Sequence, residues 1–134
     1  MLKKVFTFKD YNGLERTETH YFNLTKSELM KKEMSINGGL TEMIKRVSET
    51  LDAPVIMDIF EDLILSSYGK KSDDGRRFIK SKEISEEFKQ TEAYDQLFME
   101  LITNSEAAAA FFKAIVPEDA LEEAEKAQHP ALAK

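Results

Sequence analysis

Apolar residues recur at helical spacing in three separate stretches of this chain. Residues three and four positions apart share one side of an α-helix, so each stripe predicts a helix with one face suited to burial. The stretch from Pro54 to Gly69 is the most apolar, and Asp58, Glu61 and Asp62 take its other side. The three stripes are Leu40, Met43, Ile44, Val47 and Leu51; Val55, Ile56, Ile59, Phe60, Leu63 and Ile64; and Tyr94, Leu97, Phe98, Leu101 and Ile102.

Helix-capping residues place further helices between and after these stripes. Thr25 and Glu28 have the spacing of a capping box, which predicts a short helix to about Met34. Ser81 predicts the start of a helix through about Phe88, with Ile84 and Phe88 facing inward. The remaining signals are Asp52 as a cap and Gly69 as the end of the central helix, Asn104 or Ser105 as a cap for the alanine-rich helix that carries Phe111, Phe112 and Ile115, and Pro117 as its end.

Two stretches near the N-terminus, residues 3–9 and 15–22, predict β-strands on either side of Asn12-Gly13. This dipeptide favours a two-residue hairpin loop. Such a loop would place Phe8 opposite Thr17 and Phe6 opposite Thr19, so that Phe6, Phe8 and Tyr21 share one face. His20 would then lie on the polar face, as a surface residue. Both strands would be edges, so the hairpin needs the helical body as a partner on its aromatic face. Its edges leave two alternatives: pairing with another chain, or a hairpin that simply lies on its own domain.

The polar segment between the central helix and Phe78 predicts a tight surface turn at Ser72-Asp73-Asp74-Gly75. Phe78 and Ile79 are expected to fold back on the same core. Together these patterns predict an α+β fold, mainly α-helical, with about five or six helices and an N-terminal β-hairpin. We expect one globular domain over residues 1–117, with the hairpin at 3–22 and the helical body at 25–117, followed by a frayed or disordered polar tail at 118–134.

Composition and charge exclude several classes of function. The 134 residues include no cysteine and carry a net charge of -6. Disulfides and thiolate metal sites are therefore excluded, and the charge argues against general binding of nucleic acid, which needs a basic surface. Apolar runs are too short to span a membrane, and the N-terminus does not have the pattern of a signal peptide. We expect a soluble protein inside the cell.

No catalytic, cofactor-binding or metal site is predicted. Gly69-Lys70-Lys71-Ser72 lacks the first glycine of a phosphate-binding loop and has Lys71 at the Ser/Thr position. Asp73-Asp74-Gly75 lacks the ligand spacing of a calcium loop. Asp58, Glu61 and Asp62 allow a carboxylate metal site, but a solvated helix face explains them as well. Neither His20 nor His129 has the spacing of a zinc motif.

Arg76 and Arg77 form a pair of arginines in the predicted turn region. The preceding Asp73 and Asp74 favour local charge pairing there. The alternative is a contact with an anion or with nucleic acid, which the acidic chain disfavours.

Several segments resemble the tail assembly chaperones of long-tailed, siphovirus-type bacteriophages. The first runs from Ser67 to Ser81 and includes Tyr68, Gly69, Asp73, Asp74, Gly75, Arg76, Arg77 and Phe78. The others are Phe88 to Tyr94, Tyr21 to Thr25, Ala107 to Phe112, and Ile115-Val116-Pro117. The resemblance covers residues from about 20 to 117.

That resemblance implies a non-enzymatic protein of the host cytoplasm. Members bind the tail tube and tape-measure proteins before assembly, keep them soluble, and leave before the tail is finished. Many also exist in a longer version made by ribosomal frameshifting. The resemblance implies that this chain is the short form, with its polar tail as the place for an extension, and it carries over no catalytic residue.

A chaperone of this kind needs accessible apolar or edge-strand surface, for its clients and for association with itself. The predicted candidates are Phe6, Phe8, Tyr21, Phe111 and Phe112, with ordinary core packing as the alternative for each. Two other functions remain open at this point. One is a structural head-tail connector or tail terminator, and the other is a small phage regulator that binds a host protein or nucleic acid through the loop from Lys70 to Arg77.

Overall fold

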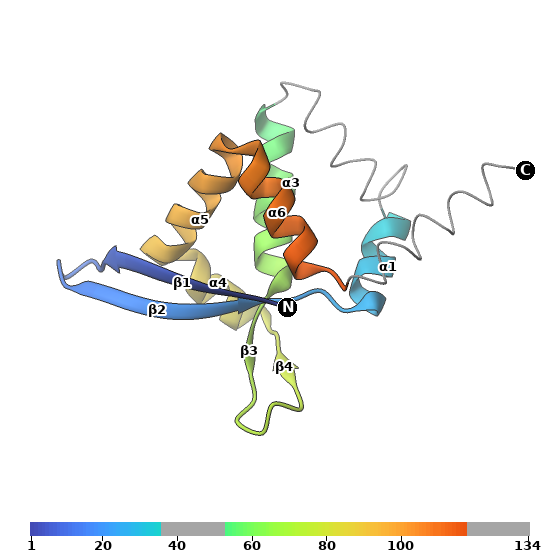
Figure 1. Cartoon of the computed structure of the whole chain (residues 1–134), viewed down its shortest axis with the longest axis horizontal. Coiled ribbons are helices and arrows are strands. Elements are labelled where there is room, and N and C mark those ends of the chain that lie inside the picture. Colours follow the sequence, from blue (N-terminus) through green and yellow to red (C-terminus); the bar gives the residue numbers. More distant parts are fainter. Residues whose placement is uncertain (36–52, 118–134) are drawn as a thin grey trace, which may run out of the picture.

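The computed structural model describes residues 1–35 and 53–117 (Figure 1). The elements in order are β1 (Leu2–Lys9), β2 (Glu15–Phe22), α1 (Lys26–Ser35), α3 (Ala53–Ser67), β3 (Tyr68–Lys71), β4 (Phe78–Ile79), α4 (Lys82–Lys89), α5 (Glu92–Thr103) and α6 (Ser105–Ile115). The predicted α+β class, dominated by helices after an N-terminal hairpin, is confirmed. The predicted helix from Leu40 to Leu51, the Asp52 cap, His129 and the polar tail lie outside the described residues.

Side-chain caps fix the starts of α1, α4 and α6 where the sequence predicts them. At α1 the bonds are reciprocal, because Glu28 N donates to Thr25 Oγ1 at 3.2 Å and Thr25 N donates to Glu28 Oε1 at 2.9 Å. Ser81 Oγ accepts from Ile84 N at 3.1 Å, and Asn104 Oδ1 accepts from Glu106 N at 3.0 Å. Each cap satisfies amide groups that have no partner inside the helix.

The hairpin register differs by one residue from the prediction. Phe8 lies opposite Arg16 and Phe6 opposite Glu18, because the loop is longer than Asn12-Gly13. Asp10 is the cause: its carboxylate accepts hydrogen bonds from the amides of Asn12 and Leu14 and pairs with Arg16. Gly13 supports this loop with a φ of 82°.

A one-residue slip in register moves a side chain to the other face of a sheet. The predicted face of Phe6, Phe8 and Tyr21 is therefore wrong: His20 shares the inner face with Phe6 and Phe8, and Tyr21 lies on the outer face. Phe6 and Phe8 are buried, and His20 is half-buried. The prediction of His20 as a surface residue is wrong for the same reason.

Two short strands follow the central helix α3, where the sequence analysis predicted only a turn. β3 pairs with β2 at Tyr21–Gly69 and Phe22–Tyr68, and β4 pairs with β3, which gives a four-stranded sheet in the order β1-β2-β3-β4. The tight turn itself is confirmed, since Gly75 N donates to Ser72 O at 2.9 Å. Phe78 and Ile79 form β4 and are half-buried beside β3, outside the buried cluster.

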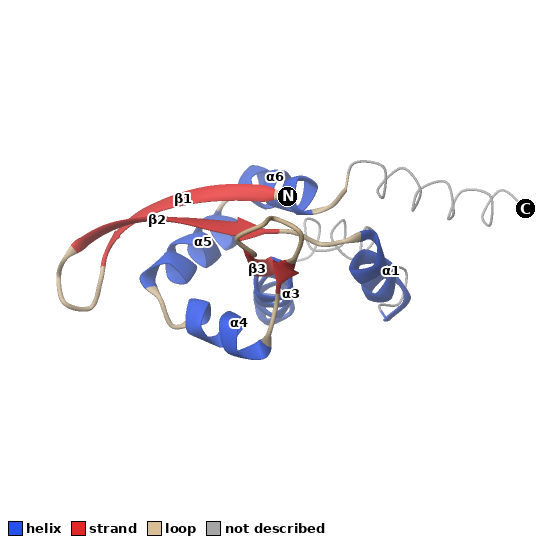
Figure 2. Cartoon of the chain, turned by 90° about the horizontal axis from the view of Figure 1, so that it is seen from below, coloured by secondary structure: helices blue, strands red, loops and turns tan. Residues whose placement is uncertain are grey.

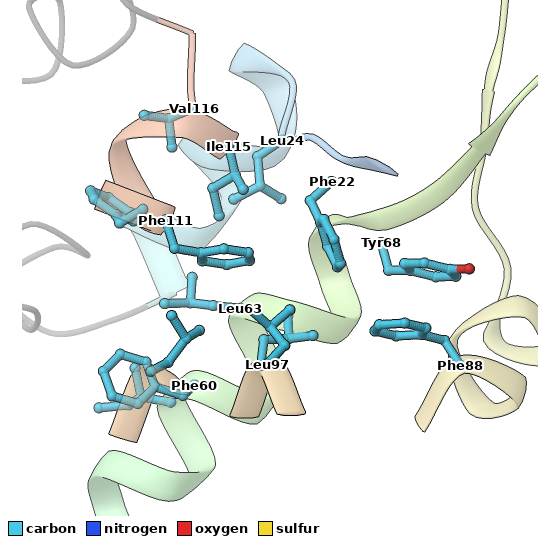
Figure 3. Close-up of a cluster of buried hydrophobic side chains, with 14 of the residues drawn as sticks. Phe22, Leu24, Phe60, Leu63, Tyr68, Phe88, Leu97, Phe111, Ile115 and Val116 are labelled. Carbon is cyan, nitrogen blue, oxygen red and sulfur yellow. The ribbon is translucent and has the colours of Figure 1, made fainter. Parts of the chain in front are cut away.

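The core forms where the inner face of the hairpin meets the helices. Figure 2 shows α4 and α5 beneath the long β1–β2 ribbon, with α6 close to the N-terminal end of β1. Aromatic rings fill the junction: Tyr68 and Phe88 stack with centroids 4.1 Å apart, and Phe22 meets Phe111 at 5.5 Å (Figure 3). The buried cluster is Phe6, Phe8, Phe22, Leu24, Leu29, Ile59, Phe60, Leu63, Ile64, Tyr68, Phe88, Ala93, Leu97, Leu101, Phe111, Phe112, Ile115 and Val116.

Lys80 ties the end of the β3–β4 hairpin to the start of α1. Its ammonium donates to both carboxylate oxygens of Glu28, at 2.8 and 2.7 Å, and to Asn23 O at 2.6 Å. Burial raises the pKa of Glu28, but the hydrogen bonds from Lys80 and Thr25 outweigh it, so the pKa lies below its ordinary value of 4.5.

Lys80→Met, which keeps the apolar stem, is expected to lower the free energy of unfolding by about 1 to 2 kcal/mol at pH 7. This lies between the values for exposed and buried ion pairs. A carboxyl whose pKa is lowered by folding stabilises the fold at pH values above its unfolded-state pKa. This stabilisation is lost as the pH falls through the folded-state pKa. The difference between wild type and Lys80→Met in urea unfolding should therefore shrink below about pH 4.5. An unchanged difference at pH 3.5 would contradict the assignment.

Candidate partner-binding surface

The five predicted surface aromatics do not form one surface. Phe6, Phe8, Phe111 and Phe112 are all buried in the described chain, and only Tyr21 is partly exposed. Phe111 and Phe112 both find apolar neighbours because α6 packs against α5 and also against β1. Core packing, the alternative considered for each residue, accounts for the four buried rings.

His20 joins the buried aromatic junction to the surface. Its Nδ1 lies 2.8 Å from Tyr68 Oη and its Nε2 lies 3.0 Å from Glu18 Oε1, so a Glu–His–Tyr chain crosses from β2 to β3. Burial raises the pKa of Tyr68 to about 12, with the charges of Glu18 and Glu87 adding to the shift. The Tyr68 hydroxyl therefore stays protonated. No sequence pattern links these residues, which are brought together by the β2–β3 pairing.

An open cavity of about 610 Å³ lies between β2 and the β3–β4 hairpin. It forms because β3 follows β2 for only two residue pairs and then diverges at Gly69. Figure 1 shows the β3–β4 hairpin pointing away from the long hairpin. The lining combines aromatic and charged residues: Glu18, Thr19, His20, Tyr21, Tyr68, Gly69, Lys70, Lys71, Ser72 and Asp73.

Positively and negatively charged side chains line this cavity. Lys71 Nζ lies 4.5 Å from the centre of the Tyr21 ring, within cation–π range. Lys70 and Lys71 are exposed on one side, whereas Glu18 and Asp73 contribute carboxylates. The cavity lining therefore carries both positive and negative side chains and is not uniformly basic.

The loop that carries Arg76 and Arg77 is organised by its own side chains. Asp74 Oδ1 accepts from Ser72 Oγ at 2.7 Å and from Arg76 N at 3.1 Å, which lowers the pKa of Asp74. Arg76 Nε also lies 3.7 Å from Asp74 Oδ2, so the predicted local charge pairing is confirmed for this arginine. Gly75 adopts a φ of 73°, as its place in the turn requires.

Exposed apolar side chains gather on the long hairpin. Val5 is 58% exposed on the outer face of the sheet, and Tyr11 and Leu14 are 77% and 61% exposed at the tip. The tip projects beyond the helices in Figure 1. The nearby charge of Glu92, at the start of α5, raises the pKa of Tyr11 above its ordinary value. Val5 is not among the predicted candidates, although its alternation with Phe6 along the strand indicates an apolar side chain on the opposite face.

Residues 1–35 and 53–117 contain no group of three or more His, Asp or Glu side chains placed to hold a metal ion. Asp62 instead pairs with Lys32, and Glu61 with Lys89. Among the helices in the same residues, none has the length and apolar character needed to cross a membrane.

Comparison with known proteins gives one clear match. A family model described as phage tail assembly chaperone matches residues 1–134, the whole chain. Searches of curated proteins and of solved structures found no match. Because the family match spans the hairpin, the helices and the loop between β3 and β4, the chain belongs to the phage tail assembly chaperone family.

Proposed function

We propose that this chain is a non-enzymatic chaperone that binds the tail tube protein, the tape-measure protein or both in the host cytoplasm and leaves before the tail is complete. The family match over residues 1–134 is the observation that carries this proposal. It also makes self-association, and pairing with a longer frameshifted form, part of the same proposal.

The fold supports this function by presenting apolar surface on a rigid base. The inner face of the hairpin is fixed by the buried cluster, and its outer face carries Val5, Tyr21 and exposed threonines. Extended client segments bind such surfaces through apolar contacts and backbone hydrogen bonds. We assign the client contact to this outer face, because it is the exposed side of the sheet and carries both Val5 and Tyr21.

Co-expression with the tail tube and tape-measure proteins encoded beside this chain tests the proposal. Wild type is expected to keep at least one client soluble and to co-purify with it, whereas finished tails should lack the chain. Val5→Asp should reduce the recovered client about fivefold or more, the scale of one important interface residue. Met99→Asp, at a similarly exposed position on α5, is the matched control and should retain the client.

Charge reversal in the loop separates this function from the alternatives. Arg76→Glu with Arg77→Glu changes two exposed side chains and should leave client binding unchanged. A regulator acting through this loop would instead lose its partner. If both clients aggregate in the presence of folded wild type, the chaperone proposal is wrong; if the chain remains in purified particles, a structural role such as a connector or terminator replaces it.

A further inference from the structure

One edge of β2 is open over most of its length. Its ladder with β3 contains only Tyr21–Gly69 and Phe22–Tyr68, and Asn23 N donates to Ser67 O on the same side. Backbone groups alternate in direction along a strand, so the N–H and C=O groups of Thr19 and Thr17 point to this side too. In the part of the chain that the structure describes, β3 pairs with neither residue.

The other edge of the sheet is better protected. Along β1, Gln96 Nε2 donates to the outward carbonyl of Thr7 at 3.0 Å, and Lys4 pairs with Glu100 at 3.3 Å. Both partner residues belong to α5, which packs against β1. A partner strand therefore meets less obstruction at β2 than at β1.

We propose that two copies of this chain pair antiparallel through the open edge of β2, with Thr17 of one copy opposite Thr17 of the other. The occupant is a second copy because the strand is complementary to itself in this register. Arg16 then lies opposite Glu18 of the second copy. The two-fold axis generates the same pairing a second time, between Glu18 and Arg16 of the second copy. This proposal names the surface for the self-association proposed above and rests on that function.

Electrostatics select this register over its neighbours. Backbone alternation allows shifts in steps of two residues. One such shift places Glu18 opposite Glu18 of the second copy, and the other places Arg16 opposite Arg16, and like charges directly opposite are destabilising. Arg16 is 52% exposed and bonds Asp10 through Nε, which leaves its terminal nitrogens for a second carboxylate. Glu18 bonds His20 through Oε1, and Oε2 faces no competing donor among the described contacts.

The same register also accounts for the exposed tip and the open cavity. Continuing the pairing places Leu14 opposite His20 of the second copy. Leu14 is 61% exposed in the single chain, and His20 lines the cavity beside Tyr68 and Lys70. Each tip thus enters the space where β3 of the other copy diverges from β2. An exposed apolar side chain and an open cavity are covered together, which favours association.

The position on the two-fold axis gives a sharp test by light scattering and sedimentation of the full chain. Thr17→Lys and Thr17→Glu each place like charges opposite one another, and each should weaken the dimer about fivefold or more. A mixture of the two variants should restore dimers, because lysine then meets glutamate. Thr7, which faces Thr17 from β1 at 3.2 Å between hydroxyls, gives the matched controls Thr7→Lys and Thr7→Glu, which should associate like wild type.

Cross-linking checks the register directly. The chain has no cysteine, so Thr17→Cys introduces a single thiol. Residues directly opposite in a hydrogen-bonded antiparallel pair have Cα atoms about 5.5 Å apart, within the range for a disulfide. Mild oxidation should give a linked dimer for Thr17→Cys and little for Thr7→Cys. Equal cross-linking of both variants, dimers unaffected by Thr17→Lys, or a wild type that stays monomeric would each overturn the proposed pairing.

The outcomes also separate this pairing from the chaperone function. A monomeric wild type that still keeps its clients soluble would refute the pairing and the self-association, and would leave the client-binding function standing. A dimer that behaves as described while both clients aggregate would support the pairing and refute the function.

Discussion

Phe88→Ala is expected to lower the free energy of unfolding by about 3 to 5 kcal/mol, the usual range for removing a fully buried phenylalanine. Phe88 is 2% exposed and stacks on Tyr68 at 4.1 Å with an interplanar angle of 8°. It also meets the rings of His20, Phe22 and Tyr94 at 4.9, 5.7 and 5.9 Å. The vacated space cannot close easily, because these rings belong to different elements.

Urea unfolding followed by far-ultraviolet circular dichroism measures this effect. Tyr11→Ala removes an aromatic ring that is 77% exposed and should change stability by no more than about 0.5 kcal/mol. Since Phe88 links α4 to both β2 and β3, its loss should also loosen the contact between the β1–β2 hairpin and the helices. Relative to wild type, amide hydrogen exchange should then speed up more in β2 than in α5. A loss below about 1 kcal/mol would mean that the aromatic junction does not hold the sheet on the helices.

Gly69→Ala is expected to cost about 2 kcal/mol, because the position has no room for a methyl group. An ideal Cβ there would lie 2.6 Å from Phe78 Cε2 and 2.9 Å from Ile79 O. The Phe78 ring is half-buried and can rotate, but the Ile79 carbonyl belongs to the backbone of β4. Relief of the clash requires β3 and β4 to separate, which disturbs the point where β3 diverges from β2.

Lys70→Ala is the control for Gly69→Ala, since Lys70 is the exposed next residue and should change stability by less than about 0.5 kcal/mol. Thermal unfolding of both variants at pH 7 makes the comparison. The chemical shifts of the Phe78 ring should move in Gly69→Ala and stay close to those of wild type in Lys70→Ala. A Gly69→Ala variant as stable as wild type would show that β4 is not held against β3 as the structure describes.

The sequence by itself determined the helices that the structure describes and most of their boundaries. Caps at Thr25, Ser81 and Asn104 act within three residues along the chain, so local sequence is enough to place them. The apolar stripe of α5 likewise identified Leu97 and Leu101, which are buried. The family resemblance, carried by the loop and helix segments, led to the same family that the whole-chain match shows.

The tertiary structure decided the sheet and hence the candidate surface. The hairpin register depends on the Asp10 carboxylate capturing the amides of Asn12 and Leu14, which Asn12-Gly13 alone did not reveal. The strands β3 and β4 are short: β3 is set by its pairing with Tyr21 and Phe22 of β2, and β4 by its pairing with β3. Contacts between residues distant in sequence have no periodic signature. For this reason the burial of Phe6 beside His20, and the open edge of β2, followed only from how the elements pack.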